Sequence, residues 1–441
     1  MDLARLHGLT RLVLDAVRVV SRLVERTDRG VSERTLGWLD LVPPVGEAAR
    51  AVETVRRVGT SVGHATVRAV THVVDAVAEV PFALLEARAA RRGAPTDAPA
   101  TPLDSDAMGS AAWLADAAQG ALSGVFGDYL ERRGNRLDPG MSLRHDGRVV
   151  RPRPAELART YAAASERIAV FVHGLSTTEW SWSYGAREQW GDSRTCYGAL
   201  LERDLGYTPV YVRYNSGRHV SDNGRELARL VDELVRGWPR PVREVVLVGH
   251  SMGGLVVRSA AHYAARDDAA WLPLLGRVTS IGAPHLGSPI EKGAHLVERV
   301  LGGIGAAAAQ VPSEILRARS AGIKDLRYGY TTDEEWRGRD PDAFFEDCRR
   351  AVPFVDSATY AFVAGSLTRD PEHPLGRLVG DLMVRVPSAR GAHPERARRV
   401  PFHGGAVLGG LSHLALVNHP DVYAVLRRLH EDEPELLATG G

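Results

Sequence analysis

One serine lies between glycines at a point where an apolar stretch changes into a helix-like one. The segment is VVLVGHSMGGLVVRS, Val245 to Ser259, and Ser251 lies between the dipeptide Gly249-His250 and Gly253, two residues further on. A strand-to-helix turn of this form strains the serine backbone and lifts the hydroxyl above a sheet, while small flanking residues avoid collisions with strand and helix. The pattern predicts a nucleophilic serine. The alternative is a serine that merely tolerates a tight turn.

A nucleophilic serine needs a base, and the base needs an acid that orients it. With this turn the expected chain order is serine, acid, histidine. After the serine, Asp370 and Asp381 are the candidate acids. Asp381 lies in VGDLMVRVPSA, whose apolar residues can shield a carboxylate, whereas Asp370 lies in a polar, Pro-flanked loop that suits turn capping. We favour Asp381 and keep Asp370 as the alternative.

Three histidines near the C-terminus are candidates for the base: His403, His413 and His419. His413 follows a short strand-like stretch and a glycine loop and precedes a final helix, so it can reach the end of a sheet. His403 begins the strand, and His419 precedes a proline near the helix start. We favour His413 as the base. The alternative is that His413 has a structural role and makes its hydrogen bonds within the C-terminal loop.

The tetrahedral intermediate of acyl transfer requires hydrogen-bond donors for its oxyanion. Met252, directly after the serine, supplies one backbone N–H. The second is expected from IAVFVHGLSTTEW, where Gly174 permits an unusual backbone and Leu175 can turn its N–H inward. His173 precedes the serine and is expected to support this loop rather than to act as the base.

The elements that must position these residues alternate along the chain. Strand-like stretches are separated by helical patterns at 225–236 and 254–265. Strands that are apolar throughout indicate a parallel sheet covered by helices, with the chemistry at the carboxyl ends of the strands. The expected strands are Ile168 to Val172, Val210 to Tyr214, Val245 to Val248, Val278 to Ile281 and Thr359 to Ala364.

Outside the sheet we divide the chain into further regions. The pattern at residues 1–92 predicts helices with one apolar stripe each. Residues 93–107 are rich in Pro and Ala, and we expect an exposed linker there. Residues 108–432 form the main domain, which a hairpin around Asp146-Gly147 enters after a helix at 111–130. At about 289–355 a helical insertion interrupts the alternation, and we favour a mobile lid over a fixed cap.

Two groups of polar and aromatic residues follow the strands that carry the site. We expect the loop at 218–223 to be held by local hydrogen bonds rather than to bind substrate. The aromatic group after the oxyanion loop either lines an acyl pocket or braces the loop, and we favour bracing. It consists of Trp180, Trp182, Tyr184 and Trp190.

Composition excludes several classes of function. The chain has 441 residues, 44% of them hydrophobic, and a formal net charge of +1, which gives no reason to propose a nucleic-acid partner. Cys196 and Cys348 are too few for a disulfide framework or a Cys-based zinc site. Charges interrupt the N-terminal apolar residues, and no stretch approaches the roughly 18 apolar residues of a membrane span. We expect a cytoplasmic protein, at most peripheral to a membrane through its N-terminal helices, without metal or cofactor.

The chain resembles the α/β-hydrolase superfamily, and within it the bacterial lipases and esterases related to the GPI inositol-deacylase group. The resemblance rests on FVHGL, YVRYNSGRHVSDNGREL, VGHSMGGLVVRSA, SIGAPHLGSP, VGDLMVRVPSA and GLSHLALVNHPDVY, within about residues 140 to 430. It implies the α/β-hydrolase fold, a triad of Ser251, Asp381 and His413, and oxyanion donors at Leu175 and Met252. The membrane spans of the eukaryotic deacylases are absent here, which argues against their anchored-glycolipid substrate.

Together these features predict a serine hydrolase that cleaves carboxylic esters, lipid or other apolar acyl esters, through an acyl-Ser251 intermediate. Acyl transfer to an alcohol would use the same triad, and the sequence does not separate it from hydrolysis. A third possibility is a catalytically inactive scaffold whose N-terminal helices bind a membrane or a partner. The joint presence of serine, acid, histidine and oxyanion loop in the expected order argues against such a scaffold.

Overall fold

The computed structural model describes residues 111–288, 320–339, 347–371 and 373–431. The predicted N-terminal helical region at 1–92 and the linker at 93–107 lie outside the described residues. So do 289–319 and 340–346 of the predicted insertion, and the lid therefore stays a prediction, as does the division into domains. All the elements below belong to one compact unit.

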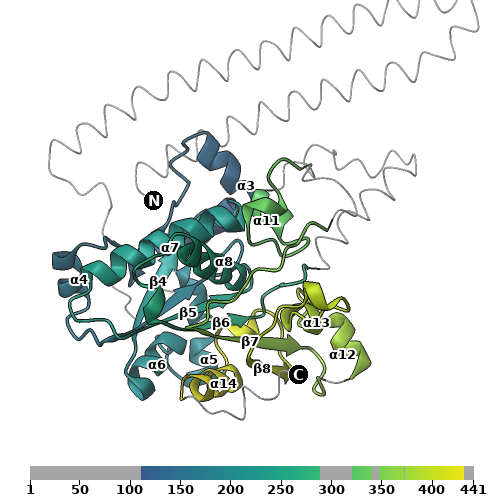
Figure 1. Ribbon diagram of the computed structural model, residues 1–441. Coiled ribbons are helices and arrows are strands. Elements are labelled where there is room, and N and C mark those ends of the chain that lie inside the picture. The colour runs from purple at the N-terminus through teal and green to yellow at the C-terminus, as the bar shows by residue number, and fades with distance from the viewer. Residues whose placement is uncertain (1–110, 289–319, 340–346, 372, 432–441) are drawn as a thin grey trace, which may run out of the picture. The chain divides into compact units, whose positions relative to one another are not determined.

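An eight-stranded sheet forms the centre of this unit, in the order β2-β1-β4-β3-β5-β6-β7-β8. β1 runs antiparallel to both of its neighbours, and every other pair of neighbours is parallel (Figure 1). The mostly parallel sheet flanked by helices that the sequence predicts is thus confirmed. The strands are β1 Ser142–His145, β2 Arg148–Val150, β3 Arg167–Val172, β4 Thr208–Arg213, β5 Glu244–His250, β6 Leu275–Ile281, β7 Thr359–Ser366 and β8 Gly404–Gly409.

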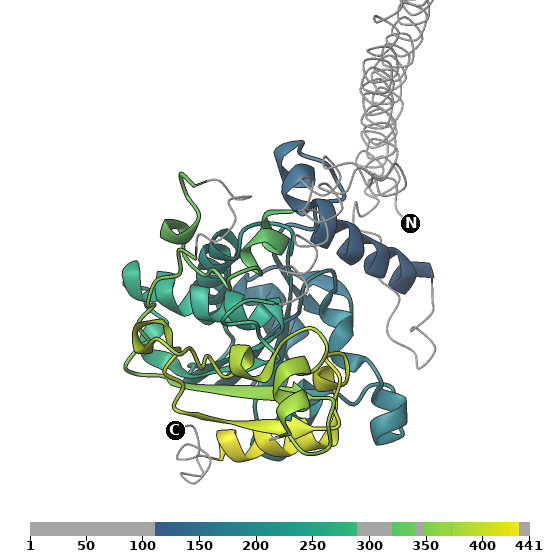
Figure 2. The same ribbon diagram turned by 90° about the vertical axis from the view of Figure 1, so that its right-hand side faces the viewer.

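Helices cover both faces of the sheet. The α-helices are α3 Ala111–Arg132, α4 Pro154–Thr160, α5 Ala186–Trp190, α6 Tyr197–Leu205, α7 Val220–Gly237, α8 Met252–Arg266, α11 Ala321–Asp325, α12 Pro374–Val379, α13 Val386–Ala389 and α14 Pro420–His430. Figure 1 shows α7 and α8 on one face and α6 and α14 on the other. In Figure 2 the yellow-green strands at one end of the sheet run above the yellow helix α14.

Alternation along the strands explains why both faces are buried. In β3, Ile168, Val170 and Val172 belong to the core under α7 and α8. Ala169 and Phe171 point to the opposite face and pack in the core with α6 and α14. Because successive side chains of a strand point to opposite faces, a strand covered on both sides must be apolar throughout.

The predicted hairpin enters the sheet as β1 and β2. Asp146 and Gly147 form its turn with φ of 48° and 72°. Two successive positive φ values match the right-handed twist of the strands and favour Asp-Gly at this position. β1 then pairs with β4 and attaches the hairpin to the parallel strands.

A buried ion cluster fixes α3 against the sheet. Arg213, at the end of β4, donates from Nη2 to Asp116 Oδ2 of α3 over 2.7 Å and from Nε to Glu179 Oε2 over 2.7 Å. All three side chains are less than 8% exposed. Trp180 Nε1 also donates to Asp116 Oδ2. Since breaking a buried ion pair leaves an uncompensated charge, this cluster specifies where α3 lies.

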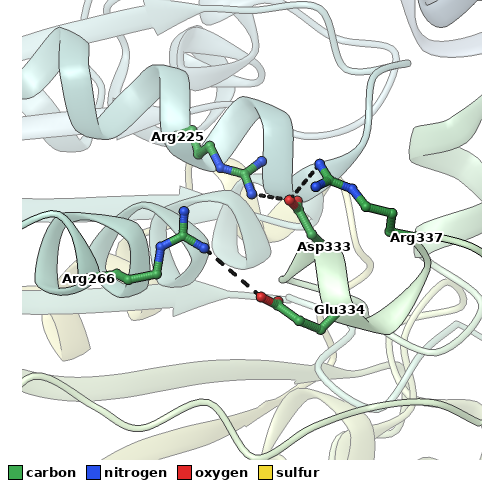
Figure 3. Close-up of a pocket in the computed structure, with 5 residues that line it drawn as sticks. All are labelled: Arg225, Arg266, Asp333, Glu334 and Arg337. Carbon is green, nitrogen blue, oxygen red and sulfur yellow. Dashed lines mark hydrogen bonds and ion pairs between the residues drawn. The ribbon is translucent and has the colours of Figure 1, made fainter.

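Another ion cluster attaches the segment that returns after residue 319. Asp333 accepts hydrogen bonds from Arg225 of α7 and from Tyr263 of α8, and it also pairs with Arg337. Figure 3 shows the contacts of Asp333 with Arg225 and Arg337 and the longer pair between Arg266 and Glu334, whose charged atoms are 4.0 Å apart. Each arginine of this group therefore faces a carboxylate.

Candidate active site

Ser251 lies in the turn between β5 and α8, at the carboxyl edge of the sheet. Its φ is 54° and its ψ is −123°, a conformation that residues other than glycine rarely adopt. The N–H of Ser251 donates to the carbonyl of Ile281 over 2.8 Å, which fixes the turn to the end of β6. The side chain is 8% exposed. The turn has the geometry that the sequence motif predicts.

The two glycines around Ser251 are required by close backbone packing. A Cβ at Gly249 would lie 2.3 Å from the carbonyl oxygen of Gly253 in α8. A Cβ at Gly253 would lie 2.2 Å from the carbonyl oxygen of Val172 at the end of β3. Real contacts of this kind are much longer, so any side chain at either position would force the helix away from the sheet.

The loop after β3 lies directly beside the serine. β3 is flanked by β4 on one side and β5 on the other, which opens a crevice at the carboxyl ends of the strands. A Cβ at Gly174 would lie 3.1 Å from Ser251 Cβ and 3.2 Å from His250 Nδ1. Gly174 is thus needed for close approach. The left-handed φ in this loop, 59°, falls on Ser176 and not on Gly174.

His173 supports this loop from inside the protein. The side chain is fully buried and stacks on Tyr214 with ring centroids 4.4 Å apart. Nδ1 donates to the carbonyl of Gly174 over 2.9 Å, and Nε2 accepts from the N–H of Tyr214 over 3.3 Å. Burial lowers the pKa of His173 to about 4. Both ring nitrogens of the neutral imidazole are therefore engaged in hydrogen bonds.

Asp381 and His413 form a buried pair. His413 Nδ1 lies 2.8 Å from Asp381 Oδ2, and the side chains are 5% and 1% exposed. The other carboxylate oxygen accepts from the N–H groups of Met383 and Val384. The N–H of His413 also donates to the carbonyl of Asp381 over 2.9 Å. These bonds leave Nε2 as the ring nitrogen of His413 that can exchange a proton with a nucleophile.

The alternative acid and bases lie in other surroundings. Asp370 is exposed, and its carbonyl accepts from Thr368 Oγ1 in a local turn. His403 Nδ1 accepts from the N–H of Tyr360. His419 precedes α14 and accepts from the N–H of Asp421 at the start of that helix. Among the described residues, neither His403 nor His419 contacts a buried carboxylate as His413 does with Asp381.

His250 connects the serine turn to the His413 loop. Its Nε2 donates to the carbonyl of His413 over 3.2 Å, and the two rings lie 4.8 Å apart. Burial, with His413 nearby, holds the pKa of His250 well below its ordinary value. Within the described part of the chain no hydrogen bond joins Ser251 Oγ to His413, a contact that often tightens only when substrate binds.

The neighbouring aromatic residues act mainly as supports. Trp182 is buried against Phe171, and Trp190 Nε1 donates to Asn418 Oδ1. Tyr184 is 53% exposed. The predicted loop at 218–223 is in part the first turn of α7, where His219 lies 3.0 Å from Asp325 and stacks on Trp336. These contacts at His219 are to residues far away in the chain and not local.

Sequence reasoning missed Gly282, at the end of β6. Its φ is 59°, and a Cβ there would lie 3.4 Å from both Asp381 Oδ2 and His413 Cε1. The signal was present in the motif SIGAPHLGSP, to which no role was given.

Among the described residues no group of three His, Cys, Asp or Glu side chains could hold a metal ion. In the same part of the chain, no helix is both long and apolar enough to cross a bilayer.

Comparisons with known proteins agree with this arrangement at the level of the family. The model of the Alpha/beta hydrolase family matches residues 169–426. No curated protein matches the chain. Similar solved structures include a lipase-esterase related protein from Clostridium acetobutylicum, which is 12% identical with a TM-score of 0.32 and coverage of 60% of this chain and 94% of that one.

Two further solved structures come from other bacteria. Phospholipase PlaB from Legionella pneumophila is 16% identical with a TM-score of 0.34, covering 62% of this chain and 64% of that one. RedJ, a thioesterase of the prodiginine pathway in Streptomyces coelicolor, is 18% identical with a TM-score of 0.30 and coverage of 62% and 92%.

The buried, neutral His173 predicts a pH dependence of stability. Between about pH 6.5 and pH 4 the unfolded chain binds a proton at this position that the folded protein does not. The free energy of unfolding should therefore fall as the pH drops through this range, by up to about 3 kcal/mol from His173 alone. Urea unfolding of wild type and His173→Gln at a series of pH values measures this contribution, with the half-exposed His145→Gln as matched control. Identical pH slopes for wild type and His173→Gln would contradict it.

Proposed function

Because the chain belongs to the Alpha/beta hydrolase family, we propose that it is a serine hydrolase that cleaves carboxylic esters of lipids or other apolar acyl compounds. The observation that carries the proposal is the buried Asp381–His413 pair at the same sheet edge as the strained turn at Ser251. A buried carboxylate that orients an imidazole is the arrangement that activates a serine hydroxyl.

In the first half of the reaction, Ser251 Oγ attacks the ester carbonyl while His413 Nε2 takes the hydroxyl proton. Asp381 holds the imidazole in orientation and stabilises its protonated form. The carbonyl oxygen becomes an oxyanion that the N–H groups of Met252 and Leu175 stabilise. Met252 is the first residue of α8, so its N–H has no acceptor within the helix. Collapse of the intermediate expels the alcohol, which receives its proton from His413.

In the second half, water attacks the acyl-Ser251 carbonyl and gives a proton to His413. The oxyanion forms again at the same two N–H groups, and Ser251 leaves with the proton from His413. The carboxylic acid is then released. An alcohol in place of water would give acyl transfer, with the same bonds broken and formed.

Exposed apolar side chains next to the acid and the base support an apolar substrate. Leu382 and Met383 follow Asp381 and are 58% and 38% exposed. Leu414 follows His413 and is 51% exposed. Leu382 also has a φ of 86°, a left-handed conformation rare for this residue type. Apolar groups that gather beside reactive residues favour contact with an acyl chain over contact with water alone.

The resemblance to lipases of the inositol-deacylase group is part of this proposal. It agrees with the apolar residues beside Asp381 and His413. Contact of the predicted N-terminal helices with a lipid surface would suit such a substrate, but residues 1–92 lie outside the described residues. The proposed chemistry uses side chains and backbone groups alone.

Kinetics on a p-nitrophenyl ester series from acetate to palmitate test the proposed function. Ser251→Ala should lower kcat by about 10⁴-fold or more, because no other group can form the acyl-enzyme. Among the wild-type substrates kcat/KM should rise with chain length, since each buried CH₂ contributes up to about 0.8 kcal/mol. The exposed Ser357→Ala is the matched control. A folded Ser251→Ala protein that keeps wild-type activity would exclude this serine as the nucleophile.

Leu414→Ser tests the apolar contact. Loss of a half-exposed leucine should lower kcat/KM for the palmitate ester by about fivefold, corresponding to about 1 kcal/mol of lost burial, and leave the acetate ester nearly unchanged. Val149→Ser, at an exposed apolar residue of β2, is the control. An equal loss on acetate and palmitate would show that Leu414 positions His413 and does not contact the acyl chain.

A further inference from the structure

A cavity whose lining does not include Ser251 is lined by arginines from several segments. Its volume is about 1060 Å³, and its lining comes from α8, the loops before β7 and β8, α12 and α13. Figure 1 shows α12 and α13 beside β7. The arginines are Arg258, Arg349, Arg350, Arg377, Arg390, Arg396, Arg398 and Arg399.

Carboxylates of the described residues do not balance these charges. Glu335 is the one carboxylate among the described lining residues, and it already accepts from the N–H groups of Thr331 and Thr332. Asp347 pairs with Arg349 and Arg398. Within the described ranges, the remaining lining arginines have no carboxylate within ion-pair distance: Arg258, Arg350, Arg377, Arg390, Arg396 and Arg399.

A buried pair in the cavity wall presents donors without acceptors. Arg258 and His285 are 7% and 2% exposed, and Arg258 Nη1 donates to His285 Nδ1 over 2.9 Å. Burial lowers the pKa of His285 well below its ordinary value, so its ring is neutral. Because Nδ1 accepts, the proton is on Nε2, and neither Nε2 nor Arg258 Nε has a hydrogen-bond partner. Such groups are costly to bury unless an acceptor is supplied.

The charge pattern differs from that of the smaller pocket in Figure 3. There, Arg225, Arg266 and Arg337 face Asp333 and Glu334, so the protein neutralises its own arginines. Among the described residues, the larger cavity lacks such neutralising groups. An anion supplied by a bound ligand would complete this cavity in the same way.

We propose that this cavity binds a ligand that carries more than one phosphate group, either a soluble compound or the headgroup of a lipid. Guanidinium groups bind phosphate oxygens with two parallel hydrogen bonds and stay charged at all ordinary pH values. Arg258, Arg377 and Arg390 come from three different helices or helix ends and approach one space, which suits several phosphate oxygens. A single carboxylate would leave most of these charges unmatched.

The cavity shares structure with the segment that carries Asp381. Ser288, three residues after His285, donates to the carbonyl of Met383 over 2.8 Å. The N–H of Leu286 donates to Ser388 Oγ, next to the lining residues 386 and 387. The wall of the cavity and the loop that holds the acid are thus connected by hydrogen bonds.

Calorimetric titration of the full chain with inorganic tripolyphosphate tests the proposal. Wild type should bind, and binding should weaken with added salt. Arg258→Gln should weaken it about tenfold or more. The double variant Arg377→Gln with Arg390→Gln changes less buried residues and should do the same, which keeps the test valid if Arg258→Gln does not fold. Arg266→Gln, in the pocket of Figure 3, is the matched control.

Two more comparisons separate the outcomes. Ser251→Ala should bind tripolyphosphate as wild type does, whether or not the proposed hydrolysis is correct. Flotation of the protein with phosphatidylcholine vesicles, with and without a phosphoinositide, distinguishes the sources of the ligand. If the phosphoinositide strengthens flotation of wild type and the double variant loses this gain, the ligand is a lipid headgroup. Binding of tripolyphosphate without stronger flotation indicates a soluble ligand. No binding by wild type, or equal loss in Arg266→Gln and the cavity variants, overturns the proposal.

Discussion

The close contact of backbone with backbone around Ser251 is the constraint on which the rest of the structure depends. A strained residue of this kind costs about 1–3 kcal/mol and persists only where its surroundings over-determine it. Here β5 is buried on both faces, and the helix that follows packs so closely that Gly249 and Gly253 have no room for a side chain. The energy of the packed sheet and helix thus offsets the strain at Ser251 and keeps the hydroxyl at the sheet edge.

The other parts of the site are attached to this turn through a short series of contacts. His250 bonds to the carbonyl of His413, and His413 bonds to Asp381 through both its ring and its N–H. On the opposite side, Gly174 brings the loop after β3 against Ser251, and His173 holds that loop with both ring nitrogens. Asp381 and His413 are therefore positioned by the same close packing that strains the serine.

Much of this architecture was predictable because its signals are local. The alternating strands, the Asp146-Gly147 turn and the glycines around Ser251 each express a rule that acts within a few residues. The preference for Asp381 over Asp370 rests on its apolar neighbours, since the chain order admits both. The structure brings Asp381 and His413 together, and the catalytic roles of these two residues are part of the proposal.

Other features could not be found from the sequence because they join residues far apart in the chain. Asp116, Glu179 and Arg213 form one cluster only after β4 and α3 have packed together. Nothing near Arg258 or His285 in the sequence shows that they meet at the wall of one cavity. The sequence also drew attention to Gly174, but glycine is needed there because Ser251 leaves no room for a side chain, and not because of a left-handed φ.

The most direct test of the central claim is to locate the nucleophile. An alkyl fluorophosphonate should react with the folded protein at a single residue, because only a serine activated by a neighbouring base attacks such a reagent readily. Mass spectrometry of the labelled peptides should place the adduct on Ser251, with labelling abolished in His413→Ala. An adduct on another residue, or no adduct on a protein shown to be folded, would contradict the account.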